Sequence, residues 1–220
     1  LSESPNLLTD ISTPTPEAQT TAAEEFLNLA RNNPRYDQIR YIDKDGTEKI
    51  RLDNEALSPQ IAPNNLLQDK STRYYVTDTL QLNKGEIYIS PLDLKIDNGT
   101  IVTPYEPMIR FTTPIFNEAN ELAGMVIINY HAGHLLPERN LDSNLVPHAH
   151  MMLINSDGFW MRGRMPQEEW GYVVPNRSDK KFQNSFPETW NTIKANRSGF
   201  TISKEGMFSY TTVYPINEAQ

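Results

Sequence analysis

Two strand-like runs carry polar side chains in an arrangement that could hold a small molecule. In the run PMIRFTTPIF, the two-residue period of a β-strand places Arg110 and Thr112 on one face. In the run EIYISPLDL, the same period places Tyr88 and Ser90 together. A face that carries arginine, tyrosine, serine and threonine is unusual for a hydrophobic core and suits the floor of a binding pocket.

Arg110 has the most specific chemistry in this set. Its strand neighbours are apolar, and a guanidinium group can bind a carboxylate through two parallel hydrogen bonds. Tyr88 and Ser90 can add uncharged donors, while Arg73 and Tyr75 in the preceding segment can close the site from above. The candidate ligand-binding residues are Arg110, Tyr88, Ser90, Tyr75, Arg73, Thr112 and Asp93.

The same residues also have a structural interpretation. A buried arginine needs a partner, so Arg110 can pair with Asp93 or Glu106 instead of a ligand. Tyr88 and Tyr75 can pack in the core with their hydroxyl groups hydrogen-bonded. The sequence leaves both interpretations open.

Other chemistry has weaker support. The four histidines form the pairs His131/His134 and His148/His150, with Glu138 and Asp142 between them, and a zinc site needs three or four converging ligands. The chain has no cysteine, Gly-rich phosphate loop, nucleophile elbow or HExxH motif. We therefore predict no catalytic residue, no metal site and no cofactor, and keep metal binding between the two halves as an alternative.

Aromatic residues of the second half suggest a further alternative. Trp160, Trp170 and Trp190, with Tyr172, could form a stacking platform in a carbohydrate-binding or protein-binding module. A module of this size also needs such residues for its core. Solvent-facing indole rings would favour the platform, and buried rings would exclude it.

The composition limits the class of protein. A net charge of −8, a pI near 5.0 and the lack of any run of lysine or arginine argue against a nucleic-acid partner. No apolar run reaches the roughly 18 to 20 residues that span a bilayer. A chain of 220 residues suits one large domain or two smaller ones, each able to form a core.

The elements that position the candidate residues can be predicted from pattern. Thr15-Pro16-Glu17 predicts a helix start, and apolar residues at helical spacing follow until Asn32. Residues 36–53 (YDQIRYIDKDGTEKIRLD) predict a hairpin turning at Asp45-Gly46. Residues 66–82 predict one or two short helices, with Ser71 as a cap. Three further strands, at 86–94, 107–116 and 124–130, would complete a five-stranded sheet.

The second half repeats this pattern in a shorter form. Residues 42–46 (IDKDG) align with residues 154–158 (INSDG) at an offset of 112, and both predict a hairpin turn at Asp-Gly. A helix over 186–195 and a hairpin around Lys204-Glu205-Gly206 follow. The common order of elements suggests a duplication.

The blocks YDQIRYIDKDGTEKIRLD, IYISPLDL and PYEPMIRFTTPIFNEANELAGMVIINY, in this order and spacing, resemble the double CACHE (tandem PDC, PAS-like) sensor domains of bacterial receptors. The resemblance covers nearly the whole chain. It implies an α+β fold with a long N-terminal helix and two PAS-like modules, each with a central antiparallel sheet flanked by helices and loops. The implied boundaries are 1–34 for the helix, 35–135 for the membrane-distal module and 136–220 for the membrane-proximal module.

The resemblance also implies a function. Similar domains form the extracytoplasmic part of inner-membrane histidine kinases or diguanylate cyclases, act as homodimers, and bind a small molecule in the distal module. Contact with the membrane would come only from flanking segments. Amino-acid-binding relatives have an arginine before Trp-Tyr and an acid on the pocket strand, whereas this chain has Arg73-Tyr74-Tyr75 and Arg110. That departure disfavours an amino acid. The expected ligand is a small anionic molecule, with a carboxylate as one candidate.

Overall fold

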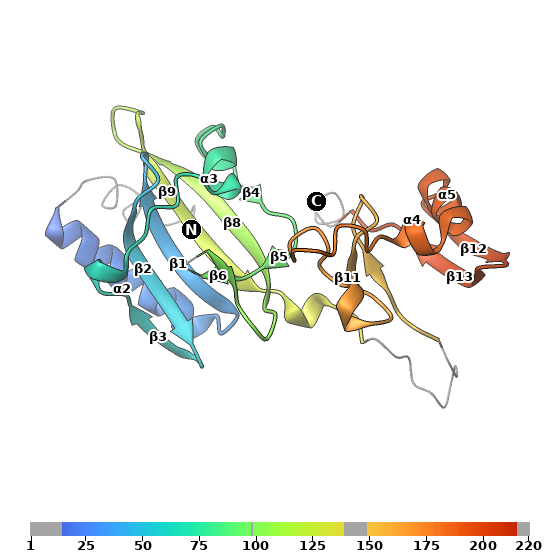
Figure 1. The fold of residues 1–220 in the computed structure, drawn as a ribbon. Helices are drawn as coiled ribbons and strands as arrows, with labels where there is room; N and C mark the ends of the chain where they lie inside the picture. Colours follow the sequence, from blue (N-terminus) through green and yellow to red (C-terminus); the bar gives the residue numbers. More distant parts are fainter. Residues whose placement is uncertain (1–14, 98, 139–148, 215–220) are drawn as a thin grey trace. The chain divides into compact units, whose positions relative to one another are not determined.

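The computed structural model describes residues 15–97, 99–138 and 149–214. The chain divides into two compact units, residues 1–134 and residues 135–220 (Figure 1). Each unit is described separately below.

A seven-stranded antiparallel sheet forms the first unit. The strand order is β3-β2-β1-β9-β8-β4, and β5 also pairs with β8. The strands are β1 (Tyr36–Asp43), β2 (Glu48–Glu55), β3 (Ser58–Ile61), β4 (Tyr88–Ile89), β5 (Asp93–Leu94), β8 (Pro107–Phe116) and β9 (Leu122–His131). A short separate pair, β6 (Ile96–Asp97) and β7 (Thr100–Ile101), lies between β5 and β8 in the chain.

The prediction of five strands was wrong for two local reasons. Residues 58–61 add an edge strand beside β2. The run EIYISPLDL, expected as one strand, is divided into β4 and β5 around Ser90-Pro91. Pro91 has no backbone N–H, so it cannot donate to a sheet ladder.

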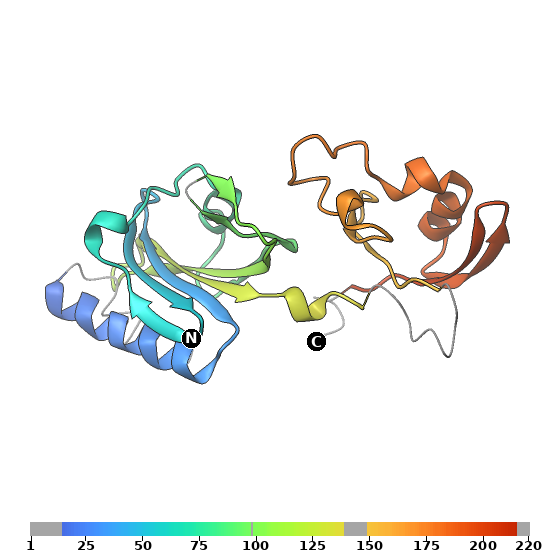
Figure 2. The ribbon, with the colours of Figure 1, turned by 60° about the horizontal axis from the view of Figure 1, so that its bottom comes forward.

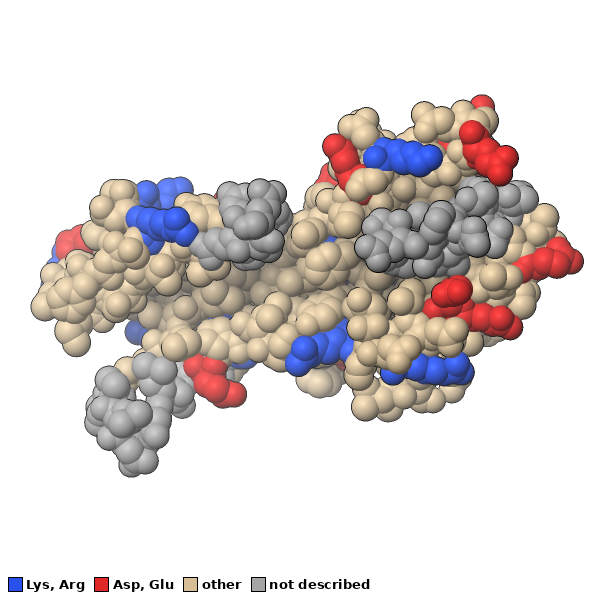
Figure 3. Space-filling view, turned by 180° about the vertical axis from the view of Figure 1, so that it is seen from behind, with Lys and Arg blue, Asp and Glu red and all other residues tan. Residues whose placement is uncertain are grey.

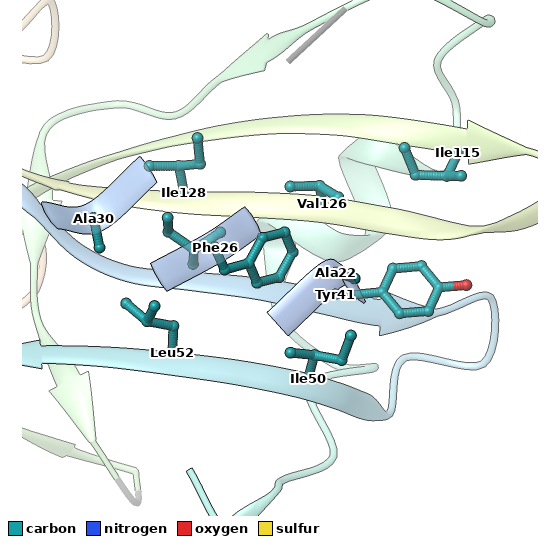
Figure 4. Close-up of a cluster of buried hydrophobic side chains, with 10 residues drawn as sticks. Ala22, Phe26, Ala30, Tyr41, Ile50, Leu52, Ile115, Val126 and Ile128 are labelled. Carbon is teal, nitrogen blue, oxygen red and sulfur yellow. The ribbon is translucent and has the colours of Figure 1, made fainter. Parts of the chain in front are cut away.

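Helix α2 (Pro16–Asn32) covers one face of this sheet, as its apolar stripe predicts (Figure 2). The Thr15 side chain accepts a hydrogen bond from Ala18 N, and Pro16 occupies the first turn. The buried helix residues pack on side chains of β1, β2, β8 and β9 (Figure 4), and this cluster consists of Ala22, Phe26, Ala30, Ile39, Tyr41, Ile50, Leu52, Ile115, Val126 and Ile128. The expected helix over residues 1–34 is described only from Pro16, because residues 1–14 lie outside the described residues.

The opposite face of the sheet carries a 3-10 turn, η1 (Asn64–Leu66), and the short helix α3 (Tyr74–Thr79). Arg73, and not the predicted Ser71, occupies the N-cap position of α3, and its side chain makes no capping hydrogen bond. The Ser71 backbone N–H instead donates to Asp69 Oδ1 at 2.8 Å. Tyr75 and Val76 of α3 pack on Ile42, Met125 and Ile127 of the sheet. This second apolar cluster covers only part of the face.

The second unit contains two hairpins and an aromatic core. The elements are η2 (Gly133–Leu135, at the boundary between the units), β10 (Leu153–Ile154), β11 (Trp160–Arg162), η3 (Pro166–Glu168), α4 (Phe182–Ser185), α5 (Pro187–Ala195), β12 (Ser198–Ser203) and β13 (Gly206–Thr211). The predicted helix over 186–195 and the predicted final hairpin are confirmed. Among the described residues of this unit, the strands form two separate pairs instead of the expected central sheet.

The first hairpin of each unit closes through the same turn. Asp43 Oδ1 accepts hydrogen bonds from Asp45 N (3.1 Å) and Thr47 N (2.8 Å). Asn155 Oδ1 accepts the corresponding bonds from Asp157 N (3.1 Å) and Phe159 N (2.9 Å).

Gly46 and Gly158 occupy the left-handed corner of these turns, with φ of 91° and 83°. The predicted Asp-Gly turns are therefore confirmed in both units.

No helix in the described part of the chain is long and apolar enough to cross a membrane. Charged residues of both signs are interspersed on the face shown in Figure 3. Three arginines of the first unit, Arg40, Arg51 and Arg110, are instead buried.

Candidate functional site

A group of buried polar side chains lies on the sheet face opposite α2. Arg40 on β1, Arg110 on β8 and Asn129 on β9 are each at most 4% exposed. The strand period that turns Ile39 and Ile128 toward α2 turns these three toward α3. On this face of the sheet, the apolar cluster under α3 is therefore followed by a polar floor formed by Arg40, Arg110 and Asn129.

Arg110 is held by partners on β5 and α3. Its Nη1 donates to Asp93 Oδ2 at 3.0 Å and to the Tyr74 hydroxyl at 3.2 Å, and its Nη2 donates to the Leu94 carbonyl at 3.3 Å. Burial raises the pKa of Tyr74 to about 12, so this hydroxyl stays protonated at neutral pH. Arg110 Nε has no hydrogen-bond partner among the described residues.

Arg40 has a similar set of partners on the other side of the floor. Its Nη2 donates to Asn129 Oδ1 at 2.6 Å, and its Nη1 lies 3.4 Å from the Tyr75 hydroxyl and 3.5 Å from Glu48 Oε1. Its Nε is buried and, within the described ranges, has no partner. Two buried arginines thus each keep one unused donor.

Tyr75 is contacted by three guanidinium groups. The centre of its ring lies 5.1 Å from Arg110 Cζ, 5.6 Å from Arg40 Cζ and 5.7 Å from Arg73 Cζ, which are cation–π distances. Burial raises the pKa of Tyr75, but the positive charges of Arg40 and Arg110 outweigh burial, so that the pKa is lower than usual. The neighbouring guanidinium groups therefore favour the ionised form of this hydroxyl.

Glu48 is the buried counter-charge of the floor. Its carboxylate lies 3.5 Å from Arg40 Nη1 and 3.3 Å from Arg51 Nη1, and it accepts a hydrogen bond from Gln68 N at 3.0 Å. A bulge in the β1–β2 pairing makes this possible, because Tyr41 pairs with Ile50 while Ile42 pairs with Glu48. The extra residue, Lys49, turns Glu48 onto the face of Arg51.

These side chains enclose a small cavity, which we call the cationic cavity. Its volume is about 10 Å³, which is space for roughly one water molecule. Five cationic residues (Arg40, Arg51, Lys70, Arg73 and Arg110) and two anionic ones (Glu48 and Asp97) line it, together with Gln38, Gln68, Tyr75, Ile96 and Asn129. In a chain with a net charge of −8, this lining has an excess of positive charge.

The candidate residues from the sequence fall into two groups. Arg110, Arg73 and Tyr75 line the cationic cavity, and Asp93 holds Arg110. Arg110 therefore pairs with the structural acid Asp93, as one interpretation predicts, and also lines the cavity. Glu106, the other acid considered as its partner, pairs with Lys95 at 3.3 Å.

The other three candidates do not line this cavity. The Ser90 hydroxyl accepts a hydrogen bond from Arg110 N and donates to the Pro91 carbonyl, both at 2.8 Å. Thr112 is hydrogen-bonded to Thr79 through its hydroxyl group. Tyr88 packs at the edge of the apolar cluster under α3.

Sequence reasoning missed several lining residues. Arg40 and Gln38 share one face of β1 by the two-residue period, so the argument used for Arg110 could have found them. Glu48 could not be found in this way, because regular alternation places it on the face of Ile50 and Leu52. Lys70 lies in a segment without periodicity.

The alternative based on the aromatic residues of the second half loses its support. Trp160 is 1% exposed and Trp170 is 2% exposed, so they do not offer an exposed platform for sugars. Within the described ranges, no group of three or more His, Asp or Glu is placed to hold a metal ion. His148 and Asp142 lie outside the described residues.

The chain is similar to known sensor domains. The family model for the sensor domain of bacterial histidine kinases matches residues 1–220. A domain of a sensory box/GGDEF family protein from Vibrio parahaemolyticus is 25% identical, with a TM-score of 0.77, over 96% of this chain and 79% of that chain. The extracellular domain of the histidine kinase vpHK1S-Z8 is 26% identical, with a TM-score of 0.72, over 92% of this chain and 71% of that chain.

More distant structures share the fold alone. The ligand-binding domain of the Campylobacter jejuni chemoreceptor Tlp3, in complex with 4-methylisoleucine, is 14% identical, with a TM-score of 0.52, over 89% of this chain and 69% of that chain. No curated protein matches the chain.

The family model and the two structures that are about one-quarter identical confirm the resemblance to CACHE-type sensors that the sequence suggests. The chain belongs to the family of bacterial histidine kinase sensor domains and is the extracytoplasmic, ligand-sensing domain of a signalling receptor.

Proposed function

We propose that this domain senses a small anion, with a carboxylate as the favoured chemistry, in the cationic cavity of its first unit. One observation carries the proposal: Arg40 and Arg110 are each 3% exposed, and each has a buried Nε without a partner among the described residues. A buried donor without a partner costs free energy, and an anion that accepts from both would recover it. The cavity as described holds about one water molecule, so a larger anion requires α3 and the segment before it to move.

The domain organisation of the receptor belongs to the same proposal. We assign residues 1–34 to an N-terminal spine helix, residues 35–135 to a membrane-distal PDC module and residues 136–220 to a membrane-proximal one. The matching turns at Gly46 and Gly158 support two related modules. The full-length protein would be a homodimeric histidine kinase or diguanylate cyclase. An anion that favours one arrangement of the modules by about 1–3 kcal/mol is sufficient to change output several-fold.

The test compares arginine variants by thermal shift with formate, acetate, propionate and succinate as probes. The wild-type domain should show a rise in Tm with at least one of them, because a ligand that binds only the folded state stabilises it. Arg110→Gln and Arg40→Gln should each abolish this rise, since each removes one of the two buried guanidinium groups.

Arg162→Gln is the matched control. Arg162 is also paired with a carboxylate, Glu169 at 3.6 Å, but it lies in the second unit and does not line the cationic cavity. This variant should keep the full thermal shift. An equal shift in wild type, Arg110→Gln and Arg40→Gln would contradict the proposal.

A further inference from the structure

A second cavity adjoins the cationic cavity and has the opposite charge. It has a volume of about 60 Å³, and four carboxylates (Asp37, Asp53, Glu55 and Asp97) and two cations (Arg51 and Lys95) line it. Gln38, Arg51 and Asp97 line both cavities. We call it the acidic cavity.

Asp37 gives the acidic cavity an unused acceptor. Its side chain is 9% exposed, and its Oδ1 accepts from Lys95 Nζ at 2.8 Å. Its Oδ2 is buried and has no hydrogen-bond partner in the described part of the chain. Burial raises the pKa of Asp37, and the contact with Lys95 offsets this only in part. The carboxylate is thus incompletely neutralised by the chain itself.

The other charges around Asp37 do not complete its hydrogen bonds. Lys95 is shared with Glu106 Oε2 at 3.3 Å, and Arg51 is bound to Asp53, Glu48 and the Leu66 carbonyl. Asp53 also accepts from Gln38 Nε2 at 2.7 Å. An ammonium group has three N–H donors and a positive charge, and the cavity volume holds several water-sized groups. An ammonium group therefore fits both the charge and the unused acceptor.

We infer that the ligand of this domain is a dipolar molecule, whose anionic group lies in the cationic cavity and whose ammonium group reaches Asp37 in the acidic cavity. This inference rests on the proposed anion site. The two cavities share lining residues, so one molecule can occupy both. Because the positive and negative cavities are separate, the ligand carries its two charges on different parts of its carbon chain.

A series of matched probes tests the inference by isothermal titration calorimetry. The dipolar probes are β-alanine, γ-aminobutyrate, δ-aminovalerate and ε-aminocaproate. Each is compared with the acid that lacks the amino group: propionate, butyrate, valerate and caproate. At the chain length that spans the two cavities, the amino acid should bind about tenfold more tightly than its unsubstituted acid, as one charge-assisted hydrogen bond allows.

Three variants locate the effect. Asp37→Asn keeps an oxygen acceptor for Lys95 and should abolish the advantage of the amino group, while the affinity for the unsubstituted acid is unchanged. Arg110→Gln should weaken both members of a pair. Glu118→Gln removes a surface carboxylate outside both cavities and should behave as wild type. The unfolding midpoint of each variant, measured without probe, checks that it folds. The comparison of amino acids with unsubstituted acids on the wild-type domain does not depend on the folding of any variant.

The outcomes separate this inference from the proposed function. If the acids bind but the amino group adds nothing at any chain length, or if Asp37→Asn keeps the advantage, the acidic-cavity inference is overturned and the anion site stands. If neither the acids nor the amino acids bind the wild-type domain, the anion site fails and the inference fails with it.

Discussion

The β1–β2 hairpin of the first unit and the β10–β11 hairpin of the second close through the same turn. Each hairpin also makes the same backbone contacts with a segment that follows it in the chain. Thr47 forms an isolated bridge with Asp69, and Phe159 forms one with Lys181. Lys70 N donates to the Gly46 carbonyl at 2.8 Å, and Phe182 N donates to the Gly158 carbonyl at 2.7 Å. Every one of these pairs is related by the offset of 112 residues that the sequence shows.

Side chains at matching positions nevertheless differ in kind. At this offset, Arg40, Glu48 and Lys70 of the cationic cavity correspond to Met152, Trp160 and Phe182. Trp160 and Phe182 lie 5.1 Å apart between ring centroids in a buried aromatic core, and Met152 packs against that core. The same turn thus stands beside a charged cavity in one unit and an aromatic core in the other. This difference supports the proposed ligand site in the first unit.

The largest effect should follow from emptying the core of the second unit. Trp160→Ala removes a side chain that is 1% exposed, and we expect it to lower the free energy of unfolding of this unit by about 3–5 kcal/mol. Urea denaturation followed by circular dichroism measures this. Added acetate should not restore the loss, because the missing group is apolar. A cost below about 1 kcal/mol would mean that the aromatic core is not the main support of the unit.

The matching substitution in the first unit should respond differently to anions. Glu48→Ala leaves Arg40 and Arg51 without their shared carboxylate, and we expect a loss of about 3 kcal/mol in the free energy of unfolding. Acetate should recover part of this loss, since its carboxylate can occupy the place of the missing one. Urea denaturation with and without acetate measures the recovery. Glu118→Ala, on the exposed surface, serves as the control, and an equal acetate effect in it would contradict the interpretation.

The two turn glycines test how similar the hairpins are. Both have positive φ, so alanine is strained at either position, by about 1–2 kcal/mol. A Cβ at Gly46 would also clash with the backbone of Ser71, whereas a Cβ at Gly158 would meet the end of the flexible Gln183 side chain. We therefore expect Gly46→Ala to lower stability more than Gly158→Ala, as measured by thermal unfolding. The reverse order would show that the two turns are held differently.

The smallest effect should be the pH dependence of Asp37, which has no counterpart in the aromatic core. Burial raises its folded-state pKa above the ordinary 3.8. Protonated Asp37 therefore favours the folded state. Its contribution to the free energy of unfolding is fully present below pH 3.8 and is lost as the pH rises through the folded-state pKa.

The side chain of Asp37→Asn does not ionise, so this variant does not lose stability as the pH rises. Its Tm should match that of wild type at low pH and exceed it slightly at neutral pH. Thermal unfolding across this pH range measures the difference. A variant that is less stable than wild type at neutral pH would show that the contact with Lys95 outweighs burial.

Much of the fold could be predicted because it depends on local pattern. The apolar stripe of α2, the Asp-Gly turns and the long strands β8 and β9 follow from periodicity and turn chemistry. The same periodicity gave the correct face for Arg110. It failed at residues 86–94, where a proline interrupts the ladder, and at the second unit, where short strands form separate pairs.

By itself, the sequence determined that this chain has two similar hairpins, a net negative charge, and an arginine with apolar neighbours on a strand of the first unit. Only the tertiary structure decided which charges meet. A one-residue bulge turns Glu48 inward, and chain folding brings Lys70 and Arg73 over Arg40 and Arg110. The physical reason is that strand period and turn type are local properties, whereas a charged cavity needs side chains distant in sequence to be buried together.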